Sequence, residues 1–391
     1  LEINFELLNP EFSSSRWNLN AMLDPDREIE LEFRIDNNGN GPLFWNIDRR
    51  LIGDANAEPW EMRRSYSIGD TLHDSRLQGA VYFDEHFYVA GSNDRAAQIY
   101  VLNKDGVLVR QFDQFGVGET YGYKDLAYDG EWIWGSEGRN IFAFTPDGEL
   151  MREFEGPVNP TNNLAWDTDR EILWVSSTTT DIVAMDRDGN QLSELNRMGI
   201  RQYGLTYWPE DPDGYQLYLF SKLDDIADQV VFKMNIETND TMSVAILEHP
   251  AGGRAAAAFC TNTYDVYSWV FMSVANEGSH DRIDIWQLEA RKEWFTVDVI
   301  TGEDRETATA GTLQTAEFAN FVLNLNSATL PETTFVAELF FNHNADSGRA
   351  HVAVELDVIG PMPPRPFDLF YPANGDTLDT LQVNFQWNPT W

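Results

Sequence analysis

The sequence is poor in cysteine and in lysine. It contains one cysteine, Cys260, within the apolar run 255–260, and only five of its 27 basic residues are lysine. A single cysteine cannot build an intrachain disulfide framework, so we expect Cys260 to be a small buried hydrophobic residue. The formal net charge of −37 repels nucleic acid and anionic lipid, which excludes both as partners. We interpret the acid excess as surface solvation suited to a salty environment, with multivalent cation binding as the alternative.

Long apolar runs and catalytic signatures are also missing. No run approaches the roughly 18 apolar residues that a membrane-spanning helix needs. The chain begins at Leu1 without a signal peptide, and we expect a mature or trimmed exported protein, extracellular or at the cell surface. No metalloprotease, nucleophile-elbow, dinucleotide or P-loop motif occurs. The six histidines are scattered, and we interpret His280–Asp281 as a surface pair, with a site at the mouth of a ring as the alternative.

A repeated β-hairpin organises the middle of the chain. Two short β-runs are joined across an Asp-Gly turn, and glycine supplies the positive φ that such turns require. The turn aspartates Asp105, Asp147 and Asp188 are 42 and 41 residues apart. A β-patterned repeat of about 40 residues is typical of a β-propeller blade. The three copies occupy 98–112, 140–154 and 181–195.

The blade pattern to which this hairpin belongs occurs five times within 60–292, counted by its inner strands. This predicts an all-β fold with a five-bladed β-propeller. The fifth repeat lacks a fourth strand, and we expect the segment 62–68 to take its place and close the ring. A sixth, degenerate blade within 36–74 is the alternative. The repeats resemble secreted bacterial propellers of the NHL, YncE and glutaminyl-cyclotransferase-like groups over about 75–292, a resemblance that implies fold and hardly any function. The predicted inner strands start near Gly79, Asp125, Asn163, Gly204 and Arg254.

Both ends of the chain carry a different β-pattern. Residues 28–35 alternate charged and apolar side chains, and a Gly/Asn-rich turn with Gly-Pro-Leu follows in 36–45. These residues resemble the opening of bacterial immunoglobulin-like modules of the BACON and choice-of-anchor kind. The expected second half of such a module appears only much later, beginning with Trp294–Val297 and including the strand 335–341.

We therefore predict one Ig-like β-sandwich built from 1–52 and 293–360, with the propeller of 60–292 inserted into one of its loops. Such an insertion costs little when the termini of the inserted domain lie close together, as those of a closed ring do.

The last part of the chain changes composition again. Residues 361–366 are rich in proline and predict a stiff, extended linker. Residues 367–391 resemble the first two strands of a fibronectin type III-like module, but two strands cannot form a sandwich. Either the chain is cut here, or this hairpin completes the sheet of a neighbouring molecule by strand addition.

Exposed aromatic residues are the candidate ligand contacts. They fall in loops or at starts of inner strands, where the central funnel of a propeller opens, and could stack on a glycan or contact a peptide. Packing between blades is the alternative interpretation. The candidates are Tyr121, Tyr123, Tyr203, Tyr207 and Trp208.

One acidic loop is a candidate metal site. Asp224, Asp225 and Asp228 are close in sequence, and clustered carboxylates repel one another unless they are solvated or bind a cation such as Ca²⁺. We favour a solvated loop, with calcium as the alternative, and expect no other cofactor. The turn 186–190 has the wrong spacing for an EF-hand.

These features together predict an exported, non-enzymatic adhesion, scaffolding or surface-assembly protein, with the propeller as a recognition or spacer module. One alternative is a subunit of an extracellular homopolymer or filament, joined by its C-terminal hairpin. The other is a propeller enzyme of the lactonase, lyase or cyclotransferase kind, with its site at the mouth of the funnel.

Overall fold

The computed structural model describes residues 7–92, 96–117, 122–223, 227–278 and 280–360, and the backbone of 369–371 and 386–387. The protein is all-β, as predicted: in these residues the helices are the short η1 (Gly53–Asn56) and α1 (Ile68–Leu72). No helix in the described ranges has the length and hydropathy needed to cross a bilayer. The chain divides into two compact units, one of Leu1–Arg50 with Lys292–Trp391 and one of Leu51–Arg291.

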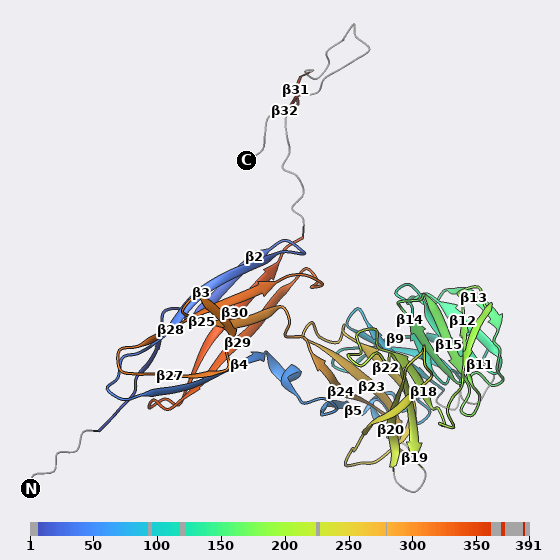
Figure 1. Cartoon of the computed structure of the whole chain (residues 1–391). Helices are drawn as coiled ribbons and strands as arrows, with labels where there is room; N and C mark the ends of the chain where they lie inside the picture. The colour runs from blue at the N-terminus through green and yellow to red at the C-terminus, as the bar shows by residue number, and fades with distance from the viewer. Residues whose placement is uncertain are drawn as a thin grey trace, which may run out of the picture. The chain divides into compact units, whose positions relative to one another are not determined.

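The first unit contains strands from both ends of the chain, drawn in blue and in orange to red in Figure 1. Its described residues form two five-stranded sheets, ordered β1-β3-β28-β25-β26 and β2-β30-β29-β4-β27. The strands are β1 (Phe12–Ser14), β2 (Asn18–Leu23), β3 (Glu28–Asn37), β4 (Leu43–Leu51), β25 (Phe295–Thr301), β26 (Asp304–Thr307), β27 (Ala310–Leu313), β28 (Phe318–Asn326), β29 (Thr334–His343) and β30 (Arg349–Val358).

Aromatic side chains fill the space between these two sheets. Phe33 on β3 lies opposite Phe321 on β28, and their ring centroids are 5.1 Å apart. From the other sheet, Trp45 and Phe341 contact Phe321 at 5.2 and 5.8 Å. Every second residue of these strands points into this core, which is why 28–35 alternates charged and apolar residues.

The second unit contains, within the described residues, five four-stranded antiparallel sheets. Four are simple meanders, because short turns connect strands that are adjacent in sequence. The strands are β6 (Ala80–Phe83), β7 (His86–Gly91), β8 (Gln98–Asn103) and β9 (Leu108–Asp113); β10 (Leu126–Tyr128), β11 (Ile133–Glu137), β12 (Asn140–Phe144) and β13 (Leu150–Glu155); β14 (Asn163–Asp167), β15 (Ile172–Ser176), β16 (Ile182–Met185) and β17 (Gln191–Leu195); β18 (Gly204–Tyr207), β19 (Leu217–Leu223), β20 (Ala227–Met234) and β21 (Thr241–Ile246); and β22 (Arg254–Thr261), β23 (Ser268–Asn276), β24 (Arg282–Ala290) and β5 (Met62–Tyr66).

The five sheets form a closed cycle. The first strands of successive sheets, which we call the inner strands, contact one another in the order β6, β10, β14, β18, β22 and then β6 again. The fifth sheet takes its outer strand from the start of the unit, where β5 pairs antiparallel with β24 (Figure 1). This pairing was expected for 62–68, although the strand ends at Tyr66 and α1 follows from Ile68.

A repeated contact joins neighbouring sheets near their outer strands. In the turn between β12 and β13, Gly148 has a φ of 87°, and a Cβ placed there would lie 2.8 Å from the ring of Phe112 on β9. On the same strand β9, Arg110 lies 3.2 Å from Asp147 of that turn. Equivalent sets are Arg152 and Phe154 with Asp188 and Gly189, and Arg64 and Tyr66 with Asp105 and Gly106. The last set joins the fifth sheet to the first. The contact that closes the ring is therefore of the same kind as the contacts that join the first sheet to the second and the second to the third.

The contact is replaced between the third and fourth sheets. On β17, Ser193 and Leu195 occupy the positions of the arginine and the aromatic residue, and the next turn, 235–240, contains no Asp-Gly. Here Asn196 N donates to Asn239 Oδ1 at 2.8 Å, and Asn239 Nδ2 donates to Asn196 O at 2.7 Å. At this interface, therefore, both the strand residues and the turn residues differ from those of the repeated contact.

One buried carboxylate connects three inner strands. Asp125, immediately before β10, is fully buried. Its Oδ2 accepts hydrogen bonds from the backbone N–H groups of Leu164 on β14 and Leu205 on β18, both at 3.2 Å, and its Oδ1 accepts from Leu126 N at 3.0 Å. Three inner strands are thus held to one side chain. Burial raises the pKa of Asp125 well above its ordinary value of 3.8, and the three N–H donors oppose that shift.

Replacing Asp125 with asparagine is expected to change the pH dependence of stability. Because the folded-state pKa is raised, the folded protein binds more protons than the unfolded chain as pH rises above 3.8, and stability falls with pH. The asparagine side chain does not titrate, so the difference in melting temperature between wild type and Asp125→Asn should shift in favour of the variant as pH rises. A difference that stays constant with pH would contradict the assignment.

Candidate ligand site at the start of the inner strands

A cavity of about 540 Å³ lies where the inner strands of the second unit begin. Every one of the five sheets contributes a lining residue at or just before its inner strand. These are Gln78, Lys124, Asn163, Tyr203 and Arg254. The cavity therefore forms only when the five sheets are arranged in a ring, and no single repeat contains it.

Basic side chains are concentrated in this cavity. Its described lining includes Arg76, Lys124, Lys222 and Arg254 and contains no aspartate or glutamate. The chain as a whole has 64 acidic and 27 basic residues, so a lining with four cations stands out against its surroundings.

Amide and hydroxyl groups complete the polar lining, and several are held by hydrogen bonds. Asn162 Nδ2 donates to Ser177 Oγ at 3.3 Å and to Thr178 Oγ1 at 3.4 Å. Asn276 Nδ2 donates to Leu77 O at 2.7 Å. Groups fixed in this way lose little freedom when a ligand binds.

Lys124, which lines the cavity, interacts electrostatically with Glu137 at the end of β11. Burial lowers the pKa of the Lys124 ammonium group, and the nearby Glu137 opposes that shift. Burial raises the pKa of Glu137, and Lys124 opposes that shift in turn. Partly buried groups whose charged forms are disfavoured by their surroundings occur often at functional sites.

The structure does not gather the predicted aromatic residues at one mouth. Tyr203 is half-buried and lines the cavity. Tyr207, at the opposite end of β18, is buried and lines a separate cavity of about 210 Å³. Tyr121 lies outside the described residues.

Tyr123 and Trp208 are corrected from candidate ligand contacts to core residues. Tyr123 is fully buried, its hydroxyl donates to Phe115 O, and it accepts from Phe115 N, both at 2.8 Å. Trp208 is buried against Tyr218, with ring centroids 5.8 Å apart. Packing between blades was the alternative interpretation of these aromatic residues. Tyr123 and Trp208 each belong to a core cluster shared by two neighbouring sheets, so this alternative holds for both.

The candidate calcium loop lies mostly outside the described residues. Asp224 and Asp225 fall there, while Asp228 is exposed on β20. In the part of the chain that the structure describes, no group of three or more His, Cys, Asp or Glu side chains is arranged to hold a metal ion. A calcium site formed by these three aspartates stays a prediction. His280 is exposed and pairs with Asp70 of α1 at 2.8 Å, but Asp281 is fully buried and accepts from Leu77 N at 2.9 Å. The two residues therefore do not form the expected surface pair.

Sequence reasoning missed the basic residues of the cavity. They stand far apart in sequence, and no spacing links them. One signal was present: two of the five lysines, Lys124 and Lys222, lie beside predicted inner or second strands. In a chain so poor in lysine, this placement could have drawn attention to the start of the inner strands.

Comparisons with known proteins add little to this description. No protein-family model matches the chain, and no curated protein matches it. Among solved structures, the chain is similar to the crystal structure of glutaminyl cyclase from Myxococcus xanthus, with 14% sequence identity and a TM-score of 0.42. The match covers 60% of this chain and 99% of that one. A likeness at this level assigns no activity to the chain.

Proposed function

We propose that this is an exported, non-enzymatic scaffolding or adhesion protein, in which a five-bladed β-propeller is inserted into an Ig-like sandwich and serves as the recognition module. The cyclic contacts of the inner strands and the pairing of β5 with β24 support the propeller. The two sheets formed by both chain ends support the sandwich. The extracellular setting remains part of the proposal.

The observation that carries the recognition role is the composition of the cavity. All five sheets contribute to it, and its described lining combines cations, amides, hydroxyls and the half-buried ring of Tyr203. No histidine, cysteine or carboxylate is among those lining residues. Convergent polar groups with one aromatic face are typical of a binding site for a polar ligand.

A binding screen tests this proposal. We expect the purified chain to bind at least one member of an array of neutral and acidic oligosaccharides and short peptides. Tyr203→Ala should weaken that binding roughly fivefold or more, about 1 kcal/mol, because the ring lines the cavity. Trp17→Ala, at an exposed aromatic of the other unit, is the matched control and should have no effect. Failure to bind any member of the array, or equal losses in both variants, would contradict the proposal.

A second candidate function, a propeller enzyme, is favoured by one observation. Lys124 and Glu137 stand beside the cavity with pKa values shifted in opposite directions by burial, as an acid–base pair could be. Turnover of a lactone, a glycan or a peptidyl-glutamine substrate that is lost in Glu137→Gln would establish the enzyme and exclude the non-enzymatic proposal.

Removing the C-terminal segment tests the homopolymer form of the proposal. Within 361–391 the structure describes β31 (Leu369–Tyr371), paired with β32 (Gln386–Trp387). If this hairpin adds to the sheet of a neighbour, light scattering should give a larger mass per particle for the full chain than for residues 1–360. Equal monomeric masses at high protein concentration would exclude assembly through this segment.

A further inference from the structure

We propose that the ring has a second ligand site at the other end of its inner strands, and that this site takes a small organic cation with an apolar body. The site is the cavity of about 210 Å³ that Tyr207 lines. The inference goes beyond the proposed recognition function, because it concerns a different cavity with a ligand of its own. It draws on the aromatic rings of the lining and on the carboxylates of the turns at this end of the ring.

Four inner strands end at this cavity, and its lining is mainly apolar. The second to fifth sheets together contribute five aromatic residues, of which two are half-buried and three are buried. These are Tyr128, Trp166, Tyr207, Phe259 and Trp269. The volume lies below the roughly 300–1,000 Å³ of pockets for drug-sized ligands. The cavity therefore suits a ligand with one ring or a short alkyl chain.

The lining carries no positive charge of its own. Its residues all lie in the part of the chain that the structure describes, and none of them is lysine, arginine or histidine. The one charged lining residue, Asp129, has no exposed side-chain surface and lies 3.1 Å from Arg187. Arg187 Cζ also lies 5.0 Å from the centroid of the Trp166 ring. A cation thus already occupies one ring at this end, and we assign the ligand to the other four, whose negative faces attract a cation.

Acidic turns lie at this end of the ring. They connect the first and second strands of the five sheets, and all of their residues are described. Each turn contains at least one carboxylate, and Arg170 is their only basic residue. The turns are 84–85, 129–132, 168–171, 208–216 and 262–267.

Basic side chains neutralise only part of this charge. Arg170 lies 3.1 Å from Asp167, which ends β14. Basic side chains that reach the turns from other strands include Arg187, paired with Asp129 and Glu131, Lys233, paired with Asp211 and Asp213, Arg63, paired with Asp265, and Lys104, which donates to Tyr264 O. The exposed turn carboxylates that have no ion pair among the described residues are Asp84, Glu85, Asp169, Glu171 and Glu210. This end of the ring therefore keeps an excess of negative charge, which attracts cations.

Two of these carboxylates bond to rings that line the cavity. Tyr207 Oη donates to Asp169 Oδ2, and Trp269 Nε1 donates to Glu210 Oε2, both at 2.6 Å. Each bond shifts electron density toward the ring, which strengthens the attraction of the ring for a cation. At Tyr207 a longer contact of 3.4 Å from Arg170 Nη1 opposes this effect.

The same two carboxylates each keep a free oxygen. Asp169 Oδ1 and Glu210 Oε1 have no hydrogen-bond donor among the described residues. Each can therefore accept an N–H of a ligand ammonium or guanidinium group, in a charge-assisted hydrogen bond. The arrangement that follows places the apolar body of the ligand among the rings and its cationic group at the acidic rim.

Titration calorimetry with three matched probes tests the inference. The probes are phenethylammonium, phenethyl alcohol and phenylacetate, which share one ring and differ in charge at neutral pH. We expect the cation to bind roughly tenfold or more tightly than the alcohol in dilute salt, and to lose part of this advantage as added salt screens the carboxylates. Phenylacetate should bind most weakly of the three.

Three variants and one control locate the binding. Glu210→Gln and Asp169→Asn keep an acceptor for the ring donor but remove a charge, so each should weaken binding of the cation roughly threefold or more and leave the alcohol unchanged. Phe259→Ala removes a lining ring and should weaken both probes. Glu194→Gln removes the same charge from an exposed position on the outer strand β17 and should change neither. The melting temperature shows whether Phe259→Ala folds; Glu210→Gln, at an exposed residue, keeps the test valid if it does not.

Several outcomes would overturn the inference. Equal binding of the cation and the alcohol would show an apolar cavity without selectivity for charge. Equal losses in Glu194→Gln and Glu210→Gln would show a general attraction to an acidic surface, and binding of no probe would refute the site. Cation binding that Tyr203→Ala weakens and Glu210→Gln does not would place the cation in the other cavity. The recognition function has its own screen at Tyr203, so its failure and the failure of this inference are separate results.

Discussion

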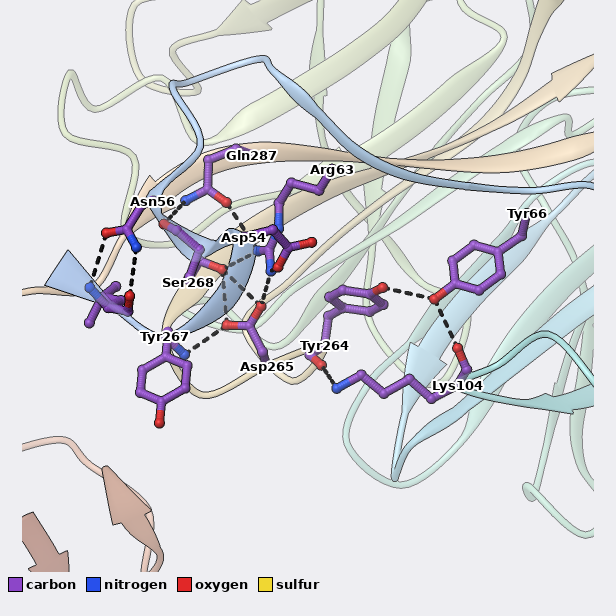
Figure 2. A network of polar contacts seen from close by, with 12 residues as sticks. Asp54, Asn56, Arg63, Tyr66, Lys104, Tyr264, Asp265, Tyr267, Ser268 and Gln287 are labelled. Atoms are coloured by element: carbon purple, nitrogen blue, oxygen red, sulfur yellow. Dashed lines mark hydrogen bonds and ion pairs between the residues drawn. The ribbon is translucent and has the colours of Figure 1, made fainter. Parts of the chain in front are cut away.

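Replacing Arg63 with methionine is expected to lower the free energy of unfolding of the 51–291 unit by about 3 kcal/mol. Arg63 on β5 has a side chain that is 3% exposed. Its Nη2 donates to Asp54 at 2.5 Å and to Asp265 at 2.6 Å, and its Nη1 donates to Ser268 at 2.6 Å (Figure 2). These contacts tie the strand that begins the unit to the sheet that ends it.

The size of this effect follows from what the change leaves behind. Methionine keeps most of the buried volume but leaves Asp265, which is 17% exposed, without its cation. Asp54 is 56% exposed and can be solvated. Arg63 Nε has no partner among the described residues, so the change also removes one unmatched buried donor. The loss should therefore fall near the lower end of the roughly 3–5 kcal/mol that breaking a buried pair costs.

Calorimetry with Arg305→Met as the control measures this loss. Arg305 is 45% exposed and pairs with Glu30, which is 55% exposed, so its removal should change the free energy of unfolding little, since water and salt screen an exposed pair. The Arg63 variant should also speed hydrogen exchange along β5 and β24, because the last sheet opens there first. Similar, small losses in both variants would show that Arg63 does not secure the ring.

Replacing Gly148 with alanine is expected to cost about 3 kcal/mol, against about 1 kcal/mol for Gly130→Ala. The two glycines have nearly the same φ, 87° and 92°. Alanine at a positive φ should therefore destabilise both variants by about the same amount. They differ in space: a Cβ at Gly130 meets nothing within 4 Å, and one at Gly148 lies 2.8 Å from the Phe112 ring. The difference between the variants therefore measures the contact between the first and second sheets.

A double-mutant cycle separates the two causes. In a Phe112→Ala background, the ring that obstructs the new Cβ is gone, and Gly148→Ala should cost about as much as Gly130→Ala. Chemical unfolding of the four proteins gives the coupling. Equal costs for the two glycine variants in the wild-type background would mean that the turn is constrained by its φ alone.

Local chemistry explains which parts of the fold the sequence predicted. The Asp-Gly turns and the alternation around them fix hairpins within a few residues, so the strands near 98–112, 140–154 and 181–195 were predicted. Counting strands then indicated that a segment before the first repeat had to complete the last sheet. Alternation in 28–35 likewise predicted β3, since only one of its faces is buried.

Features that depend on distant contacts were not predicted. The segment 62–68 was expected to be strand throughout, but the strand ends at Tyr66 and α1 begins at Ile68, with Gly69 N donating to Asp281 O at 2.7 Å. No sequence pattern near Gly69 predicts that contact with a residue more than 200 positions away. For Tyr203 and Tyr207, the sequence showed that each lies near a strand end but not that the ends open on different cavities.

The cations of the cavity were missed for the same reason. Each comes from a different sheet, and only closure of the ring brings Arg76, Lys124 and Arg254 to one opening. The spacing between them reflects the lengths of the repeats and carries no chemical pattern.

Hydrogen exchange of the full chain, with and without a bound oligosaccharide, tests the central claim most directly. A ligand that sits where the inner strands begin should slow exchange of backbone amides at 76–78, 162–163 and 254–256, on three different sheets. Slowing confined to the strands of the first unit between 295 and 358, or to 127–130 at the opposite ends of the inner strands, would contradict the assignment of this cavity as the ligand site.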